Sequence, residues 1–173
     1  MASTSTSKQP MLVDRPFHRY VTLGSTAALT TAANFSTINA AGCQLLVDCS
    51  SNDGGYVDSV SIIATQSGTT ASTVLIFLSS ATTLTTVNAS NSACVASAAI
   101  ASSAAGERTN ISLPPLSVPV PNLGATTGVG ELAKKNTGLY VPAGSVIYAG
   151  LSAVISAPSS ATVINVFAQG GFY

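Results

Sequence analysis

Residues 139–173 have the sequence LYVPAGSVIYAGLSAVISAPSSATVINVFAQGGFY, and they carry the clearest fold signal in the chain. Pro, Gly and Ser residues at 142–144 and 158–160 separate short apolar runs, as turns do between strands. The run 162–168 alternates, with Val163 and Phe167 on one face and Ile164, Val166 and Ala168 on the other. This period of two predicts half-buried antiparallel strands.

The same pattern recurs toward the N-terminus. Strands are predicted at 20–23, at 44–49 with Leu45, Val47 and Cys49 on one side, at 59–64, at 73–78 and at 111–113, and 50–55 is predicted to be a turn. The Ala-rich stretch 92–105 has some helical character, but its serines and the lack of a cap favour strand and loop. We therefore predict an all-β protein, a jelly-roll-like antiparallel β-sandwich of about eight strands.

The N-terminal residues have a different pattern. Residues 1–19 lack core periodicity and contain Pro10 and Pro16, which favour an extended arm. We expect residues 20–173 to form a single β-sandwich domain with a long loop around 121–138, which is Gly-rich and contains both adjacent lysines.

Charge excludes one class of partner. Of 173 residues only 7% are charged, and six basic side chains balance six acidic ones. A nucleic-acid-binding protein needs a basic surface to meet phosphates, so we expect no nucleic-acid partner. The low charge also weakens repulsion between copies, which suits a protein covered by neighbours in an assembly.

Hydropathy and cysteine content indicate where the protein is made and whether it spans a membrane. The longest aliphatic and aromatic run, 74–78, is far shorter than the roughly 20 residues of a spanning helix, so we expect no membrane partner. The polar N-terminus lacks the apolar core of a signal peptide, which favours synthesis in a cytoplasm. Cys43, Cys49 and Cys94 are odd in number and lack CxxC spacing, which argues against a disulfide framework or a zinc site.

Candidate catalytic groups are few. His18 is the single histidine and lies on the expected arm, and no GxSxG motif is present. Asp48, Asp53 and Asp58 surround one turn, where they could form a carboxylate pair or a calcium loop, but a solvated hairpin explains the spacing better. The glycines of 124–130 are not in phosphate-loop order, and the Asn-x-Ser sequons at Asn34, Asn88 and Asn110 are expected by chance in this composition. We expect no enzyme activity, no cofactor and no metal.

Four segments in order resemble a known family. They are VDSVSIIAT at 57–65, TVLIFL at 73–78, LYVPAG at 139–144 and NVFAQGGFY at 165–173. Together they resemble small tailed-phage head decoration (cement) proteins, in which an N-terminal arm precedes similar strands and a terminal Gly-Gly motif. The resemblance covers about 42–80 and 139–173, and the Ala/Ser-rich and Pro-rich stretches between them depart from it.

This resemblance implies a jelly-roll sandwich on the capsid exterior that binds the major capsid protein, with a homotrimer as the expected self-assembly. The alternative is a phage tail or fibre component, or a receptor- or glycan-binding β-sandwich, with a concave aromatic or acidic site near Asp48–Asp58. A hydrolase using these acids is the least favoured. The expected interface residues lie on the arm, in the Pro-rich and basic segments and at the C-terminus: Met11, Leu12, Val13, Arg15, Phe17, Arg19, Pro119, Pro121, Lys134, Lys135, Phe172 and Tyr173.

Overall fold

The computed structural model describes residues 14–24, 43–64, 72–83, 87, 90–100, 106–113, 138–152 and 163–173. Every regular element within these residues is a β-strand. The strands are β1 (Arg15–Gly24), β2 (Cys43–Asp48), β3 (Gly54–Ala64), β4 (Ser72–Ser79), β5 (Ser92–Ile100), β6 (Arg108–Ile111), β7 (Leu139–Pro142), β8 (Val146–Leu151) and β9 (Val163–Phe172). The prediction of an all-β chain is confirmed.

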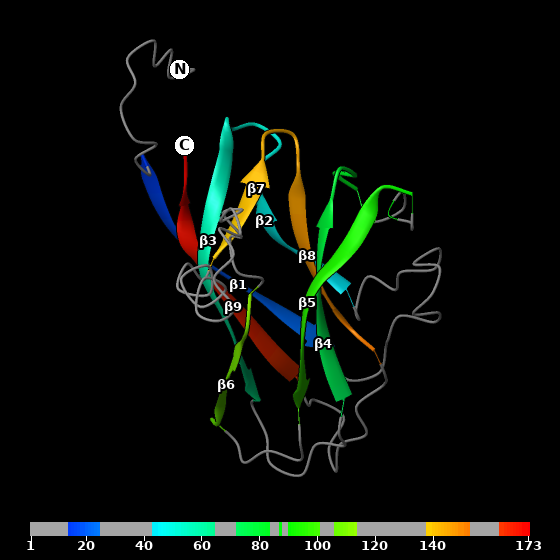
Figure 1. The fold of residues 1–173 in the computed structure, drawn as a ribbon. Coiled ribbons are helices and arrows are strands. Elements are labelled where there is room, and N and C mark those ends of the chain that lie inside the picture. Colours follow the sequence, from blue (N-terminus) through cyan, green and yellow to red (C-terminus); the bar gives the residue numbers. More distant parts are fainter. Residues whose placement is uncertain are drawn as a thin grey trace, which may run out of the picture.

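The strands form two antiparallel sheets (Figure 1). Sheet A has the order β1-β9-β3-β6, with β7 also paired to β3, and sheet B has the order β2-β8-β4-β5. Their packing confirms the predicted antiparallel sandwich.

The strand pairs are nested along the chain. β1 pairs with β9 over its whole length, from Arg15 opposite Phe172 to Gly24 opposite Val163. β2 pairs with β8, β3 pairs with both β6 and β7, and β4 pairs with β5. The first strand therefore lies beside the last, and each following pair lies one step further inward along the sequence.

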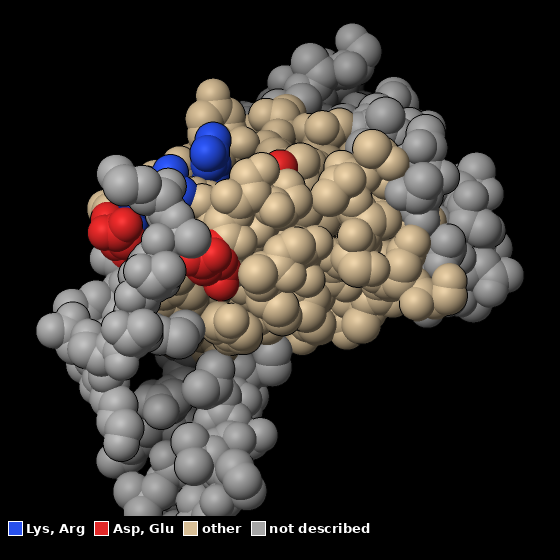
Figure 2. All heavy atoms as spheres, turned by 90° about the horizontal axis from the view of Figure 1, so that it is seen from above, with Lys and Arg blue, Asp and Glu red and all other residues tan. Residues whose placement is uncertain are grey.

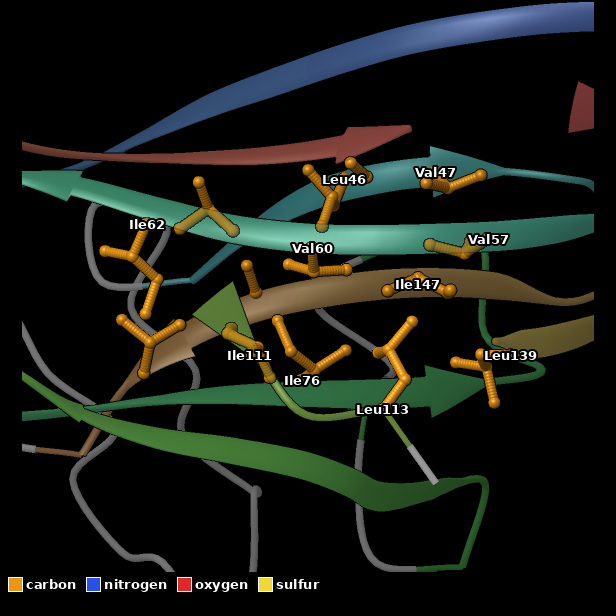
Figure 3. Packing of buried hydrophobic residues seen from close by; sticks show 14 of the residues in the cluster. Leu46, Val47, Val57, Val60, Ile62, Ile76, Ile111, Leu113, Leu139 and Ile147 are labelled. Atoms are coloured by element: carbon orange, nitrogen blue, oxygen red, sulfur yellow. The ribbon is translucent and has the colours of Figure 1, made fainter. Parts of the chain in front are cut away.

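The core lies between the two sheets (Figure 3). Val60, Ile62 and Ala64 of β3 are buried, while Ile63 between them is only half-buried. Ile76 of β4 and Ile147 of β8 meet these side chains from sheet B. Each fully buried aliphatic side chain of this kind contributes about 1.5–3 kcal/mol, so the alternating pattern of β3 directly stabilises the sandwich.

Sheet B is also buried on its outer face. Phe77 of β4 and Tyr148 of β8 point away from the main core and form a second apolar cluster with Cys43, Ala81, Val87 and Val146. The Tyr148 hydroxyl donates a hydrogen bond of 2.9 Å to the carbonyl of Ala81. All six residues of β8 are consequently buried.

Two details correct the sequence predictions. The expected arm reaches residue 19, but Arg15–Gly24 is one strand, because the main chain from Arg15 onward pairs with β9. Strand β2 does not keep one alternation: a bulge between Leu45 and Val47 puts Val47 in the main core and Leu45 against the second cluster.

The predicted turn at 50–55 is shorter than expected, because β3 already begins at Gly54. Gly54 has φ of 114°, and a side chain there would approach the Val141 carbonyl oxygen to 2.8 Å. Gly54 therefore allows β3 to approach β7 closely, in addition to marking a turn. The stretch 92–100 is a strand, as favoured, whereas residues 121–137 of the expected loop around 121–138 lie outside the described residues.

Candidate binding face on sheet A

The outer face of sheet A carries alternate residues from four neighbouring strands. Register places Tyr20 of β1 opposite Phe167 of β9, and Phe167 opposite Ser61 of β3. One row further along, His18 lies opposite Gln169, which lies opposite Ser59. Residues far apart in the sequence therefore form one patch, because β9 is hydrogen-bonded between β1 and β3.

Two aromatic side chains stand out of this face. Tyr20 is 66% exposed and Phe167 is 36% exposed, and their ring centroids are 5.7 Å apart with planes tilted by 31°. Large apolar side chains usually gain free energy from burial, so an adjacent exposed pair indicates a surface that can bind a partner.

A hollow of about 260 Å³ lies beside this aromatic pair. Its lining includes His18, Ser59, Ser61, Arg108, Phe167 and Gln169. None of the described residues that line it has a carboxylate, and Arg108 gives the hollow a positive side chain.

Ser61 is the most unusual member of this lining. It is only 4% exposed, and its hydroxyl makes no hydrogen bond with the described part of the chain. Ser79, the other buried polar residue described, accepts hydrogen bonds from the Ala81 main-chain N–H and the Ser92 hydroxyl. A buried hydroxyl without a partner costs free energy, so a ligand in the hollow would supply what Ser61 lacks.

Four of the expected interface residues meet at one corner of sheet A. Phe17 and Phe172 pack with centroids 4.7 Å apart, and the Arg15 guanidinium carbon lies 5.8 Å from the Phe172 centroid. Arg15 also donates to Asn52 Oδ1. Tyr173 packs on Tyr140, and burial, with the nearby phenols of Tyr140 and Tyr56, raises the pKa of Tyr173. Both phenylalanines are buried, so their structural role is in the core.

The remaining expected interface residues are distributed differently. Arg19 is exposed on β1, at an alternate position from His18 and Tyr20. The others lie outside the described residues: Met11, Leu12, Val13, Pro119, Pro121, Lys134 and Lys135.

The described lining of the hollow on sheet A does not include Asp48, Asp53 or Asp58, the acids named in the alternative hypothesis. Asp48 accepts a hydrogen bond of 2.8 Å from the Ser50 main-chain N–H, which is a turn-forming role. Among the described residues no group of three His, Cys, Asp or Glu side chains could hold a metal ion. Of the sequons, Asn110 is exposed on β6, while Asn34 and Asn88 are outside the described residues, as is the glycine-rich segment 124–130.

The three cysteines are free thiols, and Cys43 and Cys49 are buried whereas Cys94 on β5 is exposed. Burial raises the pKa of Cys43 to about 12. Burial, with a smaller contribution from Asp48, raises the pKa of Cys49 to about 11. At neutral pH these two thiols are therefore protonated, which makes them poor nucleophiles.

Sequence reasoning identified His18 as a candidate but missed Tyr20, Ser61, Arg108, Phe167 and Gln169. One signal was present, because the alternation of 162–168 separates Phe167 from Ile164, Val166 and Ala168. The structure confirms that separation, with those three residues in the core and Phe167 outside.

No family profile, curated protein or solved structure matches this chain. Among the described residues, no helix has the length and apolar character needed to cross a membrane.

Proposed function

We propose that this chain is a structural, non-catalytic virion protein: a head decoration protein that binds the major capsid protein on the outside of the capsid. The supporting observation is the winding of its strands. With β6 and β7 taken as two parts of one strand, the pairs are first with last, second with second-last, and so on to the β4–β5 hairpin. A hairpin wound in this way into two sheets is the jelly roll, and viral capsid domains are among its common users.

The step from fold to function is an analogy, so a contact surface is also needed. Strand β5 provides one, at the edge of sheet B (Figure 1). It is nine residues long, contains no charge and no proline, and its side chains are mostly Ala and Ser. Among the described strands it pairs with β4 alone. Because no described strand occupies its outer edge, its main-chain groups there can extend the sheet with a strand from another protein.

The edge strands of sheet A are less suited to such pairing. β1 contains Pro16, which lacks an N–H donor, and the exposed Arg19. Charges and prolines of this kind prevent unwanted strand pairing. β6 and β7 have four residues each, which is short for a stable pairing with another chain.

The surface also suits an assembly. Figure 2 shows mostly uncharged residues on the face seen from above, with the charged side chains toward one side. A chain with zero formal charge has little repulsion to overcome when copies approach one another or a lattice. A homotrimer is part of the proposal, because several linked copies bind a repeating lattice more tightly than one.

The proposal is tested by Ser97→Lys, which places a charge at an exposed position of β5. We expect capsid binding, measured by co-sedimentation with capsids that lack this protein, to weaken about tenfold or more, because a lysine opposes pairing at an edge. Ala143→Lys, in the exposed turn between β7 and β8, is the matched control and should bind normally.

Unfolding in urea shows whether both variants keep the sandwich. Labelling of the protein on virions by electron microscopy locates it on the head or elsewhere. Absence from purified virions would overturn the proposal as a whole. Normal binding of the folded Ser97→Lys variant would overturn β5 as the contact.

A tail or fibre component, or a receptor- or glycan-binding sandwich, is the second candidate. The observation that favours it is the aromatic hollow on sheet A, which has the concave shape expected of such a protein but lies away from Asp48 and Asp53. Labelling on the tail would support this candidate over the first.

A further inference from the structure

The aromatic pair next to the hollow offers a flat apolar surface of limited size. Tyr20 and Phe167 lie side by side on adjacent strands and are both exposed. A sugar ring has one face of C–H groups and a rim of hydroxyls. The C–H face can cover an aromatic ring while the hydroxyls stay hydrated or bonded to the protein, so exposed aromatic rings suit such a ligand.

The hollow supplies polar groups without partners. Ser59, Ser61 and Gln169 line it, and none of their side chains makes a hydrogen bond with the described part of the chain. Ser61 can donate and accept, and the Gln169 amide can do both at once. Hydroxyl-rich ligands need this mixture, because each hydroxyl also donates and accepts.

Charge narrows the class of ligand. Arg108 lines the hollow, and no described residue of the lining has a carboxylate, so an anionic group is favoured there and a cationic one is not. Arg108 enters from β6, which is separated from β9 by β3. At about 4.8 Å per strand spacing, β6 lies about 10 Å from β9, so the anionic group would lie to one side of the ring that stacks on the aromatic pair.

From these observations we propose that the hollow on the outer face of sheet A binds an acidic saccharide. A sugar ring stacks on Tyr20 and Phe167, its hydroxyls bond to Ser61 and Gln169, and its carboxylate or sulfate lies at Arg108. The volume of about 260 Å³ is slightly below the usual range of about 300–1,000 Å³ for ligand pockets, so one or two sugar units fit. The site is independent of β5, so it stands whether or not the chain decorates a capsid.

A glycan array is the first experiment, followed by NMR titration of the isotopically labelled full chain. The probes are sialyllactose, a sulfated uronic acid disaccharide, and lactose as the neutral control. We expect amide shifts in β1, β3 and β9 around Tyr20, Ser61 and Phe167, with either acidic probe binding about tenfold or more tightly than lactose.

Single-residue variants then show what each side chain contributes to saccharide binding. Tyr20→Ala should weaken binding of every saccharide probe, because the stacking surface is lost. Arg108→Gln should weaken the binding of acidic probes about tenfold and leave the binding of lactose unchanged. The affinity of this variant for acidic probes should also no longer depend on salt concentration, which altered folding would not produce. Tyr140→Ala removes another exposed aromatic that does not line the hollow, and Arg19→Gln removes a charge from the same strand as Tyr20; both should bind normally.

Three outcomes would overturn the proposal. They are no amide shifts with any probe at millimolar concentration, shifts that survive Tyr20→Ala, and lactose binding as tightly as the acidic probes. Protection of Tyr20 by capsid or another protein, without saccharide binding, would instead identify the face as a protein contact.

Discussion

On the outer face of sheet B, Phe77 and Tyr148 are fully buried with Ala81 and Val87, whereas on the outer face of sheet A Tyr20 and Phe167 stand in solvent. Both pairs occupy the positions that alternate with core residues. The difference is that Ala81 and Val87, which follow β4 in the sequence, pack on the outer face of sheet B. An outward aromatic is therefore a core residue where other described side chains cover it, and an exposed residue where none of them does.

The largest expected effect is the difference in stability loss between Phe77→Ala and Phe167→Ala. Phe77→Ala should lower the free energy of unfolding by about 3–5 kcal/mol, because it leaves a cavity in the second cluster. Phe167→Ala should cost about 1 kcal/mol or less, because the ring is already partly in water. Urea unfolding of both variants measures the difference. Equal losses would show that the two faces are not buried differently.

Hydroxyl removal sharpens the same comparison. Tyr148→Phe leaves the Ala81 carbonyl without its donor, so we expect a loss of about 1–3 kcal/mol. Tyr20→Phe removes an exposed hydroxyl and should change stability by no more than about 0.5 kcal/mol. Chemical unfolding at one pH compares the two, and an unchanged Tyr148→Phe stability would mean that Ala81 does not close over sheet B in solution.

The smallest effect is a pH dependence from Cys43, which belongs to the covered face. Burial raises the pKa of this thiol from 9.0 to about 12, so the folded chain keeps a proton that the unfolded chain loses. Its stabilising contribution is complete below about pH 9 and is lost as pH rises toward 12, by at most about 1.4 kcal/mol per pH unit.

Unfolding free energies between pH 8 and pH 10 should therefore fall less steeply in Cys43→Ala than in the wild type. Cys94→Ala, at the exposed edge strand, is the control and should change the slope less, because burial raises the pKa of Cys94 by less than that of Cys43. Identical slopes in all three proteins would contradict the burial of Cys43.

Local alternation made much of the fold predictable. Val60, Ile62 and Ala64 were assigned to one face of a strand, and the structure buries all three. What local patterns miss is any effect that requires a second strand. The bulge in β2 depends on its pairing with β8, and no residue within 43–48 signals it.

The terminal glycines illustrate the same limit. A side chain at Gly170 would overlap the Tyr56 carbonyl oxygen and approach the Val57 Cα to 2.9 Å, so this position needs glycine because β3 passes close to it. In the sequence, Gly170 only looks like a turn residue. The candidate site was missed for a related reason, since His18, Ser61, Arg108 and Phe167 meet only through the register of four strands.

The pairing of β1 with β9 also affects how the protein is made. During synthesis the ribosome releases β1 long before β9, so sheet A cannot be completed until almost the whole described chain has emerged. Contacts between distant segments make folding slow, and the uncharged β5 is exposed in the meantime. The nascent chain therefore faces a kinetic competition between wrapping β9 against β1 and aggregating through β5, and chaperone supply rather than thermodynamic stability would set the yield of folded protein.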